Sequence, residues 1–144
     1  MLHKNKLCNF AIKHTKYQMI EFKFNKNTGI IETIIKGKTT INDFIRYIIA
    51  LSNEKNLPET LKIITDATEG RFSEVVTPDD MYKIAEARIR FLSDKCNLMH
   101  DAFILSSSFE TALGQLYKEY SKTDDFSFNI FATKEAAFVW LNNF

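Results

Sequence analysis

The sequence has 144 residues, of which 45% are hydrophobic and 26% are charged, and this composition is typical of one ordinary soluble globular domain. The net charge is only +1, and four lysines without an acid within residues 1–16 leave the remainder mildly acidic. Because an acidic body repels phosphate, we expect no nucleic-acid partner.

Residues 1–16 are predicted to form a basic, solvated leader, followed by a single domain over residues 17–144. The apolar stretch of the leader, LCNFAI, is too short for a secretory signal and for a membrane span. Cys8 and Cys96 lie far apart and form no CxxC pair. We therefore expect a cytoplasmic protein with reduced thiols, in which Cys96 is a small buried hydrophobe.

The first predicted elements form an antiparallel hairpin. Residues 17–25, YQMIEFKFN, alternate apolar and polar side chains as a half-buried strand does. Residues 26–29, KNTG, supply the turn, and the β-branched run over residues 30–35, IIETII, supplies the second strand, which Gly37 closes.

Three strand-helix units and one helix complete the predicted chain. Each helix begins at a side chain whose oxygen can cap it: Thr40, Thr77, Ser107 and Thr133. The predicted helices cover residues 40–56, 77–97, 107–121 and 134–144, and the predicted strands lie at residues 61–67, in the run LMHDAFILSSS and at residues 126–132. In the second helix, Arg88 is expected at the edge of the packing face.

This order, ββαβαβαβα, predicts an α/β fold with one mixed sheet, in which right-handed crossovers generate parallel strands and the hairpin adds an antiparallel edge. The four glycines form neither GxGxxG nor GxxxxGK. A dinucleotide-binding or phosphate-loop domain is therefore excluded, and no cofactor is expected.

The hairpin, the helix from Thr40, LKIITDATEG and FNIFATKEAAFVWL together resemble the SpoIIAA-like branch of the STAS superfamily over most of residues 17–144. The resemblance implies that the loop after the central strand and the start of the next helix form the functional surface. Asp66 matches the acid of the family's Asp-Ser-Ser-Gly pattern, and Thr68 falls where a phosphoacceptor hydroxyl would. The chain departs from this pattern at Ala67 and Glu69.

Two functional hypotheses follow. The first is a non-enzymatic interaction module, in which the loop over residues 66–80 and the second helix bind a protein partner or a second copy of the chain, under control of Thr68 phosphorylation. The second is binding of a small, lipid-like apolar molecule, because the chain contains more aromatic residues than so small a domain usually needs. The residues of the predicted binding surface are Asp66, Glu69, Gly70, Arg71, Phe72, Glu74 and Phe91.

An enzyme is the third hypothesis, and it lacks a placed nucleophile or base. His100 and Asp101 are adjacent in a strand and should face opposite sides of the sheet, so they form no dyad. The carboxylates of the 66–80 segment match no metal-binding pattern, and no metal site is predicted. Asp66 and Thr68 can also simply satisfy backbone amides in a turn.

Overall fold

The computed structural model describes residues 19–73 and 75–144, and within them the elements follow the predicted order. The strands are β1 (Ile20–Asn25), β2 (Ile30–Thr39), β3 (Thr60–Phe72), β4 (Leu98–Ile104) and β5 (Phe126–Phe131). The helices are α1 (Ile41–Ser52), α2 (Pro78–Leu92), α3 (Ser108–Tyr120) and α4 (Lys134–Leu141). The predicted basic leader over residues 1–16 lies outside the described residues, as does Glu74.

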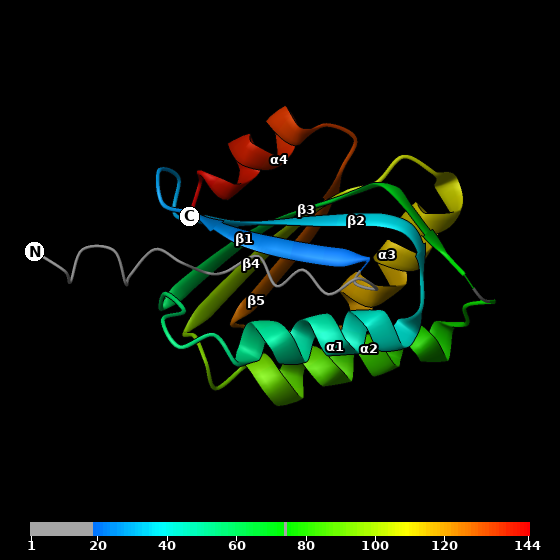
Figure 1. Ribbon diagram of the computed structural model, residues 1–144, viewed down its shortest axis with the longest axis horizontal. Helices are drawn as coiled ribbons and strands as arrows, with labels where there is room; N and C mark the ends of the chain where they lie inside the picture. The colour runs from blue at the N-terminus through cyan, green and yellow to red at the C-terminus, as the bar shows by residue number, and fades with distance from the viewer. Residues whose placement is uncertain (1–18, 74) are drawn as a thin grey trace, which may run out of the picture.

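The strands form one mixed sheet in the order β1-β2-β3-β4-β5. β1 is antiparallel to β2, whereas the pairs from β2 to β5 are parallel, each joined through one helix. Helices α1, α2 and α3 lie on one face of the sheet and α4 covers the other, as Figure 1 shows. The predicted α/β fold is confirmed, and we call the two sides the three-helix face and the α4 face.

The predicted caps explain where the helices begin. Thr40 Oγ1 accepts a hydrogen bond from Asp43 N at 3.1 Å, and an Asp43 carboxylate oxygen accepts one from Thr40 N at 2.8 Å. Thr77, Ser107 and Thr133 cap their helices in the same way, through the backbone amide three residues later. Helices α1 and α2 end several residues before the predicted ends, because the polar segments that follow them do not extend the buried stripe.

Alternation along the strands builds two cores. On the three-helix face, Ile31 and Ile63 pack with Leu51, whereas on the α4 face Ile64 packs with Leu141. Neighbouring residues of β3 are thus buried on opposite sides, as expected of a central strand that is covered on both faces.

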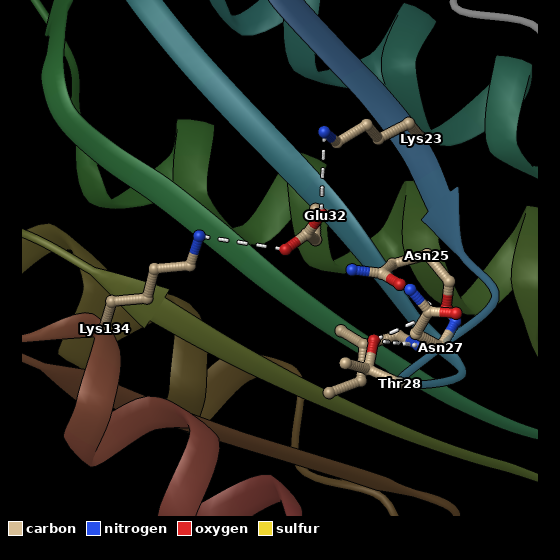
Figure 2. A network of polar contacts seen from close by, with 7 residues as sticks. Lys23, Asn25, Asn27, Thr28, Glu32 and Lys134 are labelled. Atoms are coloured by element: carbon tan, nitrogen blue, oxygen red, sulfur yellow. Dashed lines mark hydrogen bonds and ion pairs between the residues drawn. The ribbon is translucent and has the colours of Figure 1, made fainter.

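The α4 face also carries a polar network near the hairpin, which Figure 2 shows from close by. Glu32 of β2 lies 3.8 Å from Lys23 of β1 and 3.7 Å from Lys134 of α4, so it links both strands of the hairpin to the last helix. In the turn, Asn25 Oδ1 accepts a hydrogen bond from Asn27 N at 3.0 Å. These contacts connect the hairpin to α4 and involve none of the residues of the predicted binding surface.

Candidate functional site

The first part of the segment predicted to be a loop, residues 66–72, is the second half of β3, which continues to Phe72. Up to Asp66, β3 pairs with both β2 and β4; beyond it, the strand pairs with β2 alone. β3 carries one extra residue between Asp66 and Glu69 relative to Ile34–Lys36 of β2, which makes a β-bulge. The prediction of a loop over residues 66–80 is therefore wrong for its first half.

β3 is longer than predicted because β2, the strand with which it pairs, is also longer than predicted. Gly37, expected to close the hairpin, lies inside β2 with a φ of 70°, and it pairs with Gly70 of β3. A Cβ atom added to Gly70 would come within 2.8 Å of Ile35 Cγ2, so the two strands approach closely here. Polar and glycine residues that usually indicate a turn are thus held in a sheet by pairing with β2.

Asp66 and Thr68 bind each other across the bulge. Asp66 Oδ1 accepts hydrogen bonds from Thr68 N at 3.0 Å and from Thr68 Oγ1 at 2.7 Å. Ser106, just after β4, donates its hydroxyl proton to the carbonyl oxygen of Thr68 at 3.2 Å. The Asp66 carboxylate therefore accepts from local donors, one of them a backbone amide, but within a strand bulge and not in the predicted turn, while Thr68 remains partly exposed.

The other residues of the predicted surface do not converge on one point. Glu69 lies 3.9 Å from Lys36, and both side chains are largely exposed. Arg71 donates from Nη1 to the carbonyl oxygen of Gly70 at 2.6 Å, and Phe72 packs against Phe44 of α1 with ring centroids 5.6 Å apart.

A cavity lies between the three-helix face of the sheet and helices α1, α2 and α3. Its volume is about 90 Å³, and side chains from β2 to β5 and from all three helices line it. The wall is mostly apolar, with Ile48, Met81, Phe103, Leu113 and Phe128 as representative contacts. Of the predicted surface residues, Gly70, Arg71 and Phe72 also line this cavity. Phe91 packs against the same core without lining the cavity.

Two charged side chains are buried in the wall of this cavity. Asp101 of β4 is 5% exposed, and one of its carboxylate oxygens accepts a hydrogen bond from Thr65 Oγ1 at 3.1 Å. Burial raises the pKa of Asp101 to about 7, although the hydrogen bond from Thr65 and the charge of Arg88 act in the opposite direction. Asp101 therefore changes its charge near neutral pH.

Arg88 of α2 is only 2% exposed and is held by aromatic and backbone groups. Its guanidinium carbon lies 3.7 Å from the centroid of the Phe126 ring, and Nη2 donates to the carbonyl oxygen of Ser121 at 3.0 Å. The Nε atom is buried and has no hydrogen-bond partner. Burial lowers the pKa of Arg88. The expectation that Arg88 lies at the edge of the packing face is wrong, because it is buried against Phe126 and Ser121, both distant in sequence.

Two tyrosines also belong to the wall of this cavity. Tyr47 of α1 shares a hydrogen bond of 2.9 Å with Thr33 of β2, and Tyr117 of α3 faces the same cavity. Burial raises the pKa of Tyr47 well above its usual range and that of Tyr117 to about 12. Both phenols are therefore neutral at physiological pH.

Sequence reasoning did not select these four polar wall residues as a site. One signal was present, because an acid inside the apolar run LMHDAFIL is unusual for a strand covered on both faces. As predicted, His100 and Asp101 face opposite sides of β4: His100 stacks on Phe144 with ring centroids 3.8 Å apart, on the α4 face. Burial lowers the pKa of His100.

Within residues 19–73 and 75–144, no three side chains of His, Cys, Asp or Glu gather closely enough to hold a metal ion. Among the helices that the structure describes, none has the length and apolar character required to cross a bilayer.

No protein-family model and no curated protein matches this sequence. Among solved structures, the chain is similar to an uncharacterized protein of the DUF3478 family with a SpoIIAA-like fold, from Shewanella loihica PV-4. The TM-score is 0.54 at 16% sequence identity, and the match covers 85% of this chain and 91% of that chain. The chain therefore has the SpoIIAA-like fold that its sequence resembles.

Proposed function

We propose that the protein is a non-enzymatic binding module that takes up a small apolar molecule in the cavity beneath α1, α2 and α3. The observation that carries this proposal is the mostly apolar wall of that cavity. An engineered apolar cavity of about 150 Å³ binds benzene; this cavity, at about 90 Å³, is smaller, so we expect it to admit a single ring or a short chain once the lining side chains move apart.

Two phenylalanines provide a matched test. Phe72 lines the cavity, whereas Phe91 is also partly buried against the three-helix core but does not line it. We expect Phe72→Ala to weaken binding of toluene by about tenfold, because a ring contact of roughly 1.5 kcal/mol is lost. Phe91→Ala should leave toluene affinity unchanged.

Toluene affinity is measured by isothermal titration calorimetry, with circular dichroism to confirm that both variants fold. If wild-type protein binds no toluene, or if both variants weaken binding equally, the cavity is not the binding site. Native mass spectrometry of protein from its own host adds an independent test, since a resident molecule would appear as an added mass.

A second candidate function is protein interaction controlled at Thr68. It is favoured by the position of Thr68, which is partly exposed at the bulge and near Arg71, whose Nη1 lies 3.3 Å from the Thr68 carbonyl oxygen. A phosphate on Thr68 would break the hydrogen bond to Asp66 and gain the charge of Arg71 as a partner. The surface for a protein partner or a second copy would then be the bulge together with α2.

The test is the same mass spectrum combined with Thr68→Val. A mass increase of one phosphate group that maps to Thr68, and that disappears in Thr68→Val, would support the regulatory function. Phosphate at another residue, or an unmodified chain under every growth condition, would contradict it.

A further inference from the structure

The cavity wall contains a buried positive charge and a buried hydrogen-bond donor that has no acceptor. Arg88 brings a buried positive charge to it, and among the described residues no carboxylate lies within ion-pair distance of that side chain. Its Nε–H is a buried donor without an acceptor, which costs free energy in a folded protein. Of the guanidinium donors, Nε–H thus lacks an acceptor, whereas Nη2 is paired with the carbonyl oxygen of Ser121.

Asp101, the second charged group in the wall, sets the net charge beside the cavity. Asp101 is buried beside the same cavity and is ionised only in part near neutral pH. The two buried side chains therefore sum to a charge between zero and +1 under physiological conditions, and never to a negative charge. At the rim, Arg71 and Glu110 have opposite charges and offset each other.

We propose that the molecule bound in this cavity is a small monocarboxylic acid, whose carboxylate pairs with Arg88 and whose apolar body, one ring or a short chain, fills the space between the sheet and the three helices. This inference rests on the proposed binding function and specifies its ligand class. A carboxylate accepts two hydrogen bonds from the fork of one guanidinium, and this pairing is among the strongest that side chains form.

Other ligand classes fit the wall less well. A cation would meet the charge of Arg88 at short range in a medium of low dielectric constant. A purely apolar molecule would leave the Nε–H of Arg88 unpaired and the buried positive charge without an anionic partner. An acid satisfies that donor and fills the same volume.

Asp101 makes the binding of an acid depend on pH. The groups that face Asp101 are Thr65 of β3, Arg88 of α2, Tyr47 of α1 and Tyr117 of α3, and only Asp101 among them changes charge between about pH 6 and pH 8. Its ionised form repels a carboxylate, whereas its protonated form does not. Affinity for an acid should therefore rise as the pH falls through about 7.

The experiment compares three probes of similar size, benzoate, benzamide and benzylamine, by isothermal titration calorimetry on the full chain at about pH 6 and about pH 8. At the lower pH we expect benzoate to bind at least about tenfold more tightly than benzamide, because hydrogen bonds to a charged group contribute about 1.5–3 kcal/mol. Benzylamine should bind least. The preference for benzoate should shrink at the higher pH.

Two variants assign the effect to residues. Arg88→Met should abolish the preference for benzoate while benzamide still binds, which shows that the fold and the cavity survive. Asp101→Asn should make benzoate affinity independent of pH and keep it at the level that the wild type reaches at the lower pH. Circular dichroism and thermal melting check that both variants are folded; if Arg88→Met is not folded, Arg88→Lys, which keeps the charge but loses the fork, should still reduce the preference.

The outcomes distinguish this inference from the proposed function. Equal binding of benzoate and benzamide by the wild type, or a preference for benzylamine, would overturn the acid inference and leave the apolar binding site standing. A benzoate preference that persists in Arg88→Met would also overturn it. If none of the three probes nor toluene binds, the proposed function and this inference both fail.

Discussion

At the scale of single residues, Asp101 shows how the fold sets the chemistry of a side chain. Its carboxylate lies on the three-helix face of β4, where burial disfavours the charge and raises the pKa to about 7. The same residue type at Asp43, in the capping box of α1, has its pKa lowered despite partial burial, because hydrogen bonds from Thr40 and the nearby Arg46 stabilise the charge. Burial without sufficient compensating donors is what distinguishes Asp101.

This difference predicts a pH-dependent stability. A carboxyl group whose pKa is higher in the folded than in the unfolded protein binds its proton more tightly when folded, so its stabilising effect is present at low pH and is lost as the pH rises. Between the unfolded value near 4 and the folded value of about 7, the free energy of unfolding should fall by about 1.4 kcal/mol per pH unit from this group.

Asp101→Asn should remove that slope and leave the variant more stable than the wild type at about pH 8, since its amide oxygen can still accept the hydrogen bond from Thr65. Urea denaturation of both proteins at several pH values measures the difference. A variant that retains the full slope would show that Asp101 is not the group responsible.

At the scale of elements, the close approach of β2 and β3 is the feature that positions the cavity rim. Gly70 allows it, because a Cβ at this position would lie 2.8 Å from Ile35 Cγ2 and 3.3 Å from the Ile35 carbonyl oxygen. Gly114 of α3 offers a matched contrast, since its Cβ would lie 2.7 Å from Ile130 Cδ1, the mobile end of a flexible side chain.

Gly70→Ala should therefore lower the free energy of unfolding by about 1–3 kcal/mol, because backbone and a branched side chain must shift. Gly114→Ala should lower the free energy of unfolding by less, or leave it unchanged, because replacing glycine with alanine inside a helix stabilises the helix by about 1 kcal/mol. Chemical denaturation of the two variants shows which substitution lowers the free energy of unfolding more. If Gly114→Ala is the more damaging, the strand contact is looser than the structure indicates.

The elements also show what could be predicted from the sequence. The caps at Thr40 and Thr77 are local patterns, and both were predicted correctly because a cap involves only residues three apart. The second half of β3 was missed because its strand conformation depends on pairing with β2, about thirty residues earlier in the chain. Arg88 was wrongly predicted to lie at the edge of the packing face for a similar reason. Its contacts are with Phe126 and Ser121, which lie outside α2 and far along the chain.

At the scale of the whole molecule, the two faces of the sheet are packed differently. The α4 face has a small, closely packed core around Ala102 and Ala137, both 0% exposed. The three-helix face has a larger core that encloses the cavity, with Ala67 of β3 in its wall. This cavity therefore lies on the side where three helices cross the sheet.

A pair of strand alanines tests this asymmetry. Ala67→Leu places additional methyl groups in the cavity, so we expect the free energy of unfolding to stay constant or rise, by about 0.8 kcal/mol for each carbon that is buried without strain. Ala102→Leu introduces the same atoms into the packed α4 face and should destabilise the protein by about 1–3 kcal/mol.

The same two variants separate stability from binding. Ala67→Leu should abolish toluene and benzoate binding because it occupies their volume, whereas Ala102→Leu should retain binding despite its lower stability. Denaturation with urea gives the first comparison and calorimetric titration gives the second. If Ala67→Leu is as destabilising as Ala102→Leu, the three-helix face has no usable free volume. If Ala67→Leu also binds both probes as the wild type does, the binding site must lie elsewhere.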